Sequence, residues 1–205
     1  MRQLTYPDLS CIILIGGKSL RLGRDKALEQ LGANNLTERV LQTVSSFKTE
    51  IILVENSKVS HRQFNNFPKL RYTTDVYPGK GPLGGVYTGL IDSNTSYNLV
   101  VACDMPLLNV GLLHYMVEQA PGFDMVIPRT GNYVEPLHAV YSKRCLGAMK
   151  KLIERNVLQI NRLLPSLNIR YIEPEEIDRF DSRHLSFINI NTEADLKKAK
   201  ELLEK

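Results

Sequence analysis

A short apolar run leads directly into a glycine-rich, basic segment near the start of this 205-residue chain. Residues 11–15 read C-I-I-L-I, and residues 16–26 read G-G-K-S-L-R-L-G-R-D-K. The run is short and contains several isoleucines, which predicts a buried strand. A glycine pair at the end of a strand lets the backbone approach a ligand, and backbone N–H groups and cations there suit phosphate. The two segments together predict a strand that ends at a nucleotide-phosphate site.

This segment is neither of the two commonest phosphate-binding loops. No window of the chain supplies the Walker A pattern G-x-x-x-x-G-K-[ST]. The Rossmann fingerprint G-x-G-x-x-G is also missing, because Gly16, Gly17 and Gly23 have the wrong spacing. Taken alone, the segment is also compatible with a surface loop whose charges are solvated.

Strand and helix patterns alternate along the first half of the chain. Asn35 and Glu38 have the spacing of a capping box at the start of a helical apolar stripe that reaches Phe47. Such alternation predicts an α/β fold with a mostly parallel sheet and helices on both faces. The predicted strands are residues 11–15, 51–54, 70–74 and 97–103, and the further helices are residues 60–65 and 83–91.

The second half is less regular. We expect strands at residues 124–128 and 134–142, joined as a hairpin through Gly131 and Asn132, and a helix at residues 143–154. Thr192 and Asp195 resemble a capping box that opens a charged terminal helix. Two further strands are predicted, at residues 168–172 and 187–190.

Composition excludes several classes of protein. The formal net charge of +4 is mild and its basic residues are dispersed, which argues against a dedicated nucleic-acid binder but suits an anionic small substrate. The three cysteines, Cys11, Cys103 and Cys145, are far apart and are expected to be reduced core residues. With no apolar run of eighteen residues, we expect a cytoplasmic protein.

Polar residues follow three of the predicted strands. These strand ends are Gly16-Gly17, Asp75 and Asp104, and the carboxyl ends of parallel strands share one edge of a sheet. Asp104 is the strongest candidate, because a carboxylate at this point suits Mg²⁺ together with substrate phosphates and water. The competing interpretation is that Asp104 caps the next helix.

The loop at residues 75–85, D-V-Y-P-G-K-G-P-L-G-G, has a shaped backbone because it is rich in glycine and proline. Its Lys80 either reaches phosphate or is solvated, and Gly84-Gly85 would let a base or pterin ring lie against the chain. The loop contains no Ser, Cys or His nucleophile. The spacing of the four histidines supports neither a catalytic triad nor a zinc site.

Five segments of the chain resemble, in order, the motif blocks of molybdenum cofactor guanylyltransferases. Residues 14–26 are similar to the signature L-A-G-G-x-S-x-R-M-G-x-D-K, with Ile15 in place of Ala and Leu22 in place of Met. Many sugar-nucleotide and cofactor nucleotidyltransferases share this first block, but its G-G-x-S form and D-K ending favour the guanylyl branch. The later blocks are Gly81–Gly85, Asp104–Pro106, Glu135–His138 and Asn189–Thr192, and the P-L-H in the third of these favours the same branch.

The resemblance implies a fold and a reaction. The fold is one three-layer α/β/α domain over residues 1–205, with a mostly parallel, Rossmann-like sheet of the nucleotidyltransferase (glycosyltransferase-A-like) type. Its nucleotide-binding half is expected at about residues 8–105, and its acceptor-binding half at about residues 106–205. The reaction is Mg²⁺-dependent transfer of GMP from GTP to the terminal phosphate of molybdopterin, or molybdenum cofactor, with release of pyrophosphate.

The resemblance also assigns roles to individual residues. Asp104 is expected to hold Mg²⁺, and Arg21 and Lys26 to neutralise the reacting phosphorus and the departing pyrophosphate. Asn189 and Asn191 are expected on the metal or pterin side. The implied GTP-binding residues are Leu14, Ile15, Gly16, Gly17, Lys26, Asp75 and Asp104.

The implied partners are GTP and molybdopterin, with a GTP-binding adaptor or a cofactor-delivery protein as a further possibility, and neither nucleic acid nor a membrane. Two alternatives stay open from the sequence. One is a related nucleotidyltransferase that uses CTP or a sugar phosphate on the same fold. The other is a nucleotide-binding regulatory module without turnover, against which the full set of Arg21, Lys26, Asp75 and Asp104 argues.

Overall fold

The computed structural model describes residues 8–15, 26–55 and 64–203 of the chain. Its strands are β1 (Leu9–Ile15), β2 (Gln30–Leu31), β3 (Asn34–Asn35), β4 (Glu50–Glu55), β5 (Leu70–Thr74), β6 (Tyr97–Ala102), β7 (Met125–Thr130), β8 (Tyr133–Val134), β9 (His138–Ser142) and β10 (Ile169–Ile172). Its helices are α1 (Leu36–Val44), α2 (Gly81–Asp92), α3 (Val110–Glu118), α4 (Leu146–Glu154), α5 (Pro174–Asp181) and α6 (Glu193–Leu203). Short 3₁₀ helices cover Lys26–Leu28, Ser45–Phe47, Lys143–Cys145, Ile160–Ser166 and Leu185–Phe187.

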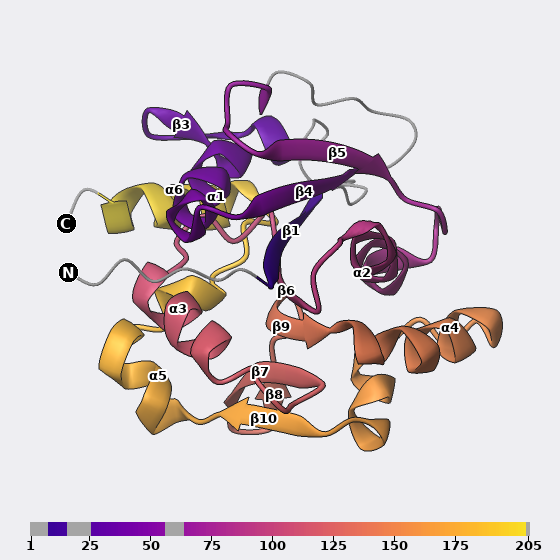
Figure 1. Ribbon diagram of the computed structural model, residues 1–205. Helices are drawn as coiled ribbons and strands as arrows, with labels where there is room; N and C mark the ends of the chain where they lie inside the picture. Colours follow the sequence, from indigo (N-terminus) through magenta and orange to yellow (C-terminus); the bar gives the residue numbers. More distant parts are fainter. Residues whose placement is uncertain (1–7, 16–25, 56–63, 204–205) are drawn as a thin grey trace.

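One mixed sheet runs through the molecule in the order β10-β7-β9-β6-β1-β4-β5 (Figure 1). Strand β1 lies between β4 and β6 and is parallel to both, and β4 is parallel to β5. Strand β9 runs antiparallel to both of its neighbours, β6 and β7, whereas β7 and β10 are parallel to each other. The predicted fold class, a mostly parallel sheet, is confirmed.

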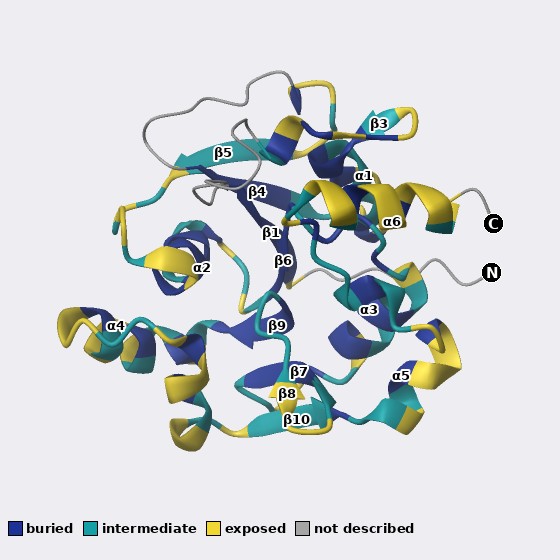
Figure 2. Ribbon diagram, turned by 180° about the vertical axis from the view of Figure 1, so that it is seen from behind, coloured by how far each residue is buried: buried dark blue, intermediate teal, exposed yellow. Residues whose placement is uncertain are grey.

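Each face of the sheet has its own apolar core. Because side chains alternate along a strand, Cys11 and Ile13 of β1 pack on the face covered by α1 and α3, while Ile12 and Leu14 pack on the face covered by α2 and α4. Figure 2 shows β1 and the inward-facing parts of these helices in the colour of buried residues. The three cysteines are buried and free of disulfides, as predicted.

Both predicted capping boxes are present at the starts of their helices. Asn35 and Glu38 form the predicted capping box of α1, in which each side chain accepts a hydrogen bond from the backbone N–H of the other. Thr192 and Asp195 form the same reciprocal pair at α6. Among the described helices, none is long and apolar enough to cross a membrane.

Helix α2 forms although it contains four glycines, and two of them leave room for side chains of β1. A Cβ atom on Gly89 would lie 2.5 Å from Ile12 Cγ2, and one on Gly85 would lie 3.3 Å from Leu14 Cδ2. A Cβ on Gly84 would lie 2.9 Å from the Tyr77 carbonyl oxygen. These contacts give Gly84 and Gly85 a reason in packing, and the expectation that they let a base or pterin ring lie against the chain stays a prediction.

Two predicted elements differ from those in the structure, and a third lies mostly outside the described residues. The strand predicted at residues 134–142 is two strands, β8 and β9, because Pro136 has no N–H and residues 135–138 form a turn. Residues 187–190 are not a strand: a 3₁₀ helix ends at Phe187, and the Ile190 N–H bonds to the Asp104 carbonyl. The helix predicted at residues 60–65 lies mostly outside the described residues.

Candidate active site

The carboxyl ends of β5, β4, β1 and β6 lie along one edge of the sheet, because these four strands are adjacent and parallel. Ile15, Asp75 and Asp104 stand at or just beyond these ends. Backbone hydrogen bonds hold the segments together: the Cys103 N–H donates to the Leu14 carbonyl at 3.1 Å, and the Asp75 N–H donates to the Glu55 carbonyl at 2.9 Å. The predicted convergence of polar strand ends is confirmed for the ends that the structure describes.

Lys26 contacts two segments at this edge that are far apart in the sequence. Its Nζ lies 2.6 Å from Asp104 Oδ2 and 2.7 Å from Asn191 Oδ1. The ion pair is half-buried, with the Lys26 and Asp104 side chains 14% and 22% exposed. The segment that carries Asn191 is held by the hydrogen bond from the Ile190 N–H to the Asp104 carbonyl, 2.9 Å long. Lys26, Asp104 and Asn191 form the centre of the candidate site, and Asn189 lies on the same segment.

Asp104 does not cap the next helix, so the competing interpretation is wrong. Helix α3 begins after Asn109, whose side chain accepts the Leu112 N–H at 3.0 Å. The other carboxylate oxygen of Asp104, Oδ1, is buried and has no hydrogen-bond partner within the described residues. An unpaired buried carboxylate oxygen at this position fits a hard divalent cation that is also bound by phosphate and water. No cluster of three or more His, Cys, Asp or Glu side chains exists in the described part of the chain that would bind a metal without such ligands.

Asp75 shapes the loop after β5. Its Oδ1 accepts the Tyr77 N–H at 2.9 Å and the Thr88 hydroxyl at 2.9 Å, so the carboxylate ties the loop to α2. Lys80, on the same loop, neither points into the site nor is left free: its Nζ donates to Asn156 Oδ1 at 2.8 Å.

Leu14 and Ile15 end strand β1 with side chains that are 9% and 4% exposed. The side chain of Ile15 therefore packs in the core. The other predicted residues of the first block, Gly16, Gly17 and Arg21, lie outside the described residues.

The structure adds Glu135, which sequence analysis placed in a motif block without giving it a role. Glu135 lies in the turn before β9 and is half-buried. Burial raises the pKa of its carboxyl group, and the negative charge of Asp104 raises it further, against a smaller opposite effect of the Leu137 backbone. The Pro136 that follows it was the sequence signal for a turn at this point.

His138, the first residue of β9, is fully buried and packs against Phe187, with ring centroids 5.1 Å apart. Neither of its ring nitrogens has a hydrogen-bond partner within the described part of the chain. Burial lowers its pKa to about 4, although the Asp181 carboxylate and the Ser186 backbone oppose this shift. A neutral imidazole in such surroundings is part of the core and not a catalytic triad.

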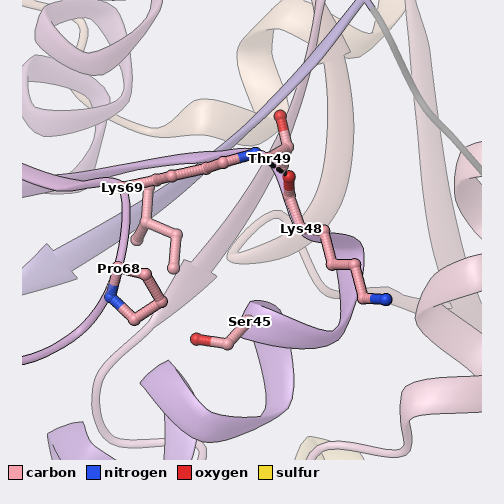
Figure 3. A pocket seen from close by; sticks show the side chains of 6 residues that line it. Ser45, Lys48, Thr49, Pro68 and Lys69 are labelled. Atoms are coloured by element: carbon pink, nitrogen blue, oxygen red, sulfur yellow. Dashed lines mark hydrogen bonds between the residues drawn. The ribbon is translucent and has the colours of Figure 1, made fainter.

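A surface pocket lies at the opposite edge of the sheet, where β4 and β5 begin. In Figure 3 the Lys69 side chain reaches over it to the backbone carbonyl of Lys48. Because this pocket is at the amino ends of the strands, it is not the candidate active site. Its lining residues are Ser45, Lys48, Thr49, Ile51, Pro68 and Lys69.

A mostly parallel sheet flanked by helices is the Rossmann-like arrangement of nucleotidyltransferases. The fold of a 2-C-methyl-D-erythritol 4-phosphate cytidylyltransferase from Thermus thermophilus is similar, with a TM-score of 0.70 at 14% identity over 95% of this chain and 98% of that one. The chain belongs to the family of MobA-like NTP transferase domains, whose model matches residues 11–168. The predicted family resemblance is confirmed.

Relatives that span nearly the whole chain carry more specific names. A probable molybdenum cofactor guanylyltransferase from Pelotomaculum thermopropionicum is 33% identical over 94% of this chain and 92% of its own length. A molybdenum cofactor guanylyltransferase from Desulfosudis oleivorans is 31% identical over 92% of each. The solved structure of molybdopterin-guanine dinucleotide biosynthesis protein A from Archaeoglobus fulgidus matches with a TM-score of 0.82 at 28% identity, over 95% of this chain and 98% of that one.

Proposed function

We propose that this chain is a molybdenum cofactor guanylyltransferase, which transfers GMP from GTP to the terminal phosphate of molybdopterin. A phosphate oxygen of the acceptor forms a bond to the α-phosphorus of GTP. The bond from that phosphorus to the bridging oxygen breaks, and pyrophosphate leaves with the electron pair. The observation that supports this most is the contact of Lys26 with Asp104 at the carboxyl edge of the sheet, in a chain of this family.

The protein's task in such a reaction is to position the reactants and to neutralise charge, because the attacking oxygen is already an anion. The Lys26 ammonium has three N–H donors. Two are directed at Asp104 and Asn191, so within the described residues a third is left for a phosphate oxygen. We assign to Arg21 the same task, the neutralisation of phosphate charge. We assign the binding of GTP to Leu14, Ile15, Gly16, Gly17 and Asp75.

The unpaired Oδ1 of Asp104 supports a divalent-cation site. Mg²⁺ is the natural occupant, and Asp104 would hold it. When bound, the cation supplies positive charge to the triphosphate and fixes its orientation. We further assign the nucleotide to residues 8–105 and the acceptor to residues 106–205 of a single domain that acts in the cytoplasm.

The fold alone does not decide which base the enzyme accepts, because cytidylyltransferases share it. A cytidylyltransferase is therefore the alternative function to test. Isothermal titration with Mg²⁺ and, in turn, GTP, CTP, UTP and ATP tests it. We expect a preference for GTP of at least tenfold, about 1.4 kcal/mol. Equal binding of the four nucleotides, or a preference for CTP, would overturn the guanylyl assignment and leave the fold as it is.

A second assay tests the transfer itself. Purified protein, Mg²⁺, GTP and molybdopterin should give a guanine dinucleotide product and pyrophosphate in equal amounts. Tight binding of GTP without product, even with an excess of acceptor, would support the regulatory module instead.

A further inference from the structure

The turn that carries Glu135 is held rigidly. The His138 N–H donates to the Glu135 carbonyl at 3.0 Å, which closes the turn. The Tyr141 hydroxyl donates to the Pro136 carbonyl at 2.8 Å, and the Ala102 N–H donates to the Leu137 carbonyl at 3.2 Å. Tyr141 is fully buried, so the anchor of this turn is in the core. A turn held at three points presents its glutamate in a defined position.

The strand register places this turn beside Asp104. Val101 of β6 pairs with His138 of β9, and the two strands are antiparallel. Asp104 comes three residues after Val101, and Glu135 comes three residues before His138. Because the two strands run in opposite directions, both residues lie at the same edge of the sheet. The negative charge of Asp104 also raises the pKa of the Glu135 carboxyl group, which agrees with this placement.

Negative charge at this point exceeds the positive charge that the described residues supply. Lys26 is directed at Oδ2 of Asp104, whereas Oδ1 is buried and unpaired. Within the described ranges, no lysine or arginine forms an ion pair with Glu135. Two carboxylates that share a site are unfavourable unless a cation lies between them. Mg²⁺ is commonly held by one or two carboxylates together with substrate phosphates.

We propose that Glu135 is a second carboxylate of the divalent-cation site and holds the cation together with Asp104. This inference rests on the proposed function, because that function brings a nucleoside triphosphate and its cation to the site. It extends the site from the nucleotide half of the chain into the half assigned to the acceptor. The alternative is that Glu135 only stabilises its own turn through the Leu137 backbone.

The test compares the affinity for GTP with excess Mg²⁺ and with EDTA, measured by calorimetry without acceptor. The ratio of the two dissociation constants is the Mg²⁺ preference. If Glu135 holds the cation, Glu135→Gln should lower this preference at least tenfold. It should do so by weakening the binding of Mg·GTP while metal-free GTP binds as well as before or more tightly, because a charge that repels phosphate has been removed.

Three further variants make the result decisive. Asp104→Asn should lower the Mg²⁺ preference in the same way, and Glu135→Asp should keep most of it. Glu118→Gln removes one charge from an exposed position on α3 and should leave both affinities within twofold. Circular dichroism checks that each variant is folded.

The outcomes separate the two proposals. A wild type that needs Mg²⁺ but a Glu135→Gln variant with an unchanged preference would overturn the role of Glu135 alone. Equal weakening of both forms of GTP would also overturn it, because that is the effect of a damaged turn. A wild type that binds GTP equally with and without Mg²⁺ would overturn the cation site and this inference together, while the guanylyl assignment would still be judged by the choice among nucleotides.

Discussion

Lys26 links residues that are far apart in the sequence. Asp104 and Asn191 are 78 and 165 positions away from it, and its side chain bonds to both. Ion pairs at the surface contribute little to stability, but this pair is half-buried and lies at the carboxyl edge of the sheet. We therefore interpret the contact as one that positions Lys26 for phosphate, and expect its loss to affect catalysis more than folding.

Replacing Lys26 with alanine should lower kcat for GMP transfer by about 10²–10³-fold, because a fixed cation at a centre of developing charge is lost. The measurement is the initial rate of pyrophosphate release, with the fold checked by circular dichroism. Lys69→Ala is the matched control, since Lys69 lines the pocket in Figure 3 and lies just before the amino end of β5, at the opposite edge of the sheet, and its rate should stay within twofold. A Lys26→Ala enzyme that keeps more than a tenth of the wild-type rate would contradict this role.

At the scale of single elements, helix α2 shows how local propensity gives way to packing. Gly84, Gly85 and Gly89 weaken the helical pattern of its sequence. The helix forms because it lies close against β1, where Gly89 leaves room for Ile12 and Gly85 leaves room for Leu14. The close approach brings the start of α2 and the loop held by Asp75 to the carboxyl edge of the sheet.

Gly89→Ala should therefore destabilise the protein by about 1–3 kcal/mol, because its Cβ would overlap Ile12 in a filled core. Gly147→Ala in α4 is the matched control: among the described residues, no atom beyond its chain neighbours and its own helix backbone lies within 4 Å of the Cβ that alanine would add, and alanine is favoured in helices. We expect this control to stabilise the protein by about 0.5–1 kcal/mol. The free energy of unfolding in urea measures both, and effects of the same sign would show that packing against β1 does not explain the glycine.

The elements that sequence analysis misjudged are those whose pairing is not local. The β-branched and apolar residues at 187–190 suit a strand, but no neighbouring strand is available to them, and Ile190 makes one hydrogen bond to Asp104 instead. Residues 134–142 alternate as a strand does, yet the turn at Glu135 and Pro136 divides them. In the first case a tertiary contact at the candidate site takes the place of strand pairing, and in the second the local signal of Pro136 ends the strand.

At the scale of the whole molecule, the two halves of the chain meet at His138. The strand β9 that begins with it joins the first four parallel strands to β7 and β10, and its ring packs on Phe187 from the C-terminal part. Protonation of a buried imidazole that has no hydrogen-bond partner among the described residues costs free energy, so the neutral form of His138 is favoured in the folded state. The stability of the whole fold is therefore coupled to the pH.

The sign of this coupling follows from the two pKa values of His138, 6.5 as the ordinary value and about 4 in the folded protein. Between them the unfolded chain binds a proton that the folded chain does not, so the free energy of unfolding falls as the pH falls. We expect a loss of about 2 kcal/mol from this residue between pH 7 and pH 5, measured by urea denaturation.

His138→Leu removes the titrating group and is the variant with which to compare. Between pH 7 and pH 5, the free energy of unfolding of the variant should fall by about 2 kcal/mol less than that of the wild type. The pKa of Glu176 is lowered to about 2, where hydrogen bonds from Arg170 and Tyr115 outweigh burial, so this carboxyl titrates below the interval. Identical pH dependence in the two proteins would contradict a neutral, buried His138.

The sequence by itself determined what depends on neighbours along the chain. The strand at residues 11–15, the two capping boxes, the alternation of strands and helices, and the candidates Lys26 and Asp104 could all be predicted, because periodicity and helix caps are local physics. The family blocks added the expected reaction. The tertiary structure decided which distant groups meet: that Lys26 bonds to Asn191 as well as Asp104, and that the turn at Glu135 faces the same edge. Such contacts follow from strand order and register across β9, which long-range packing sets and local patterns leave open.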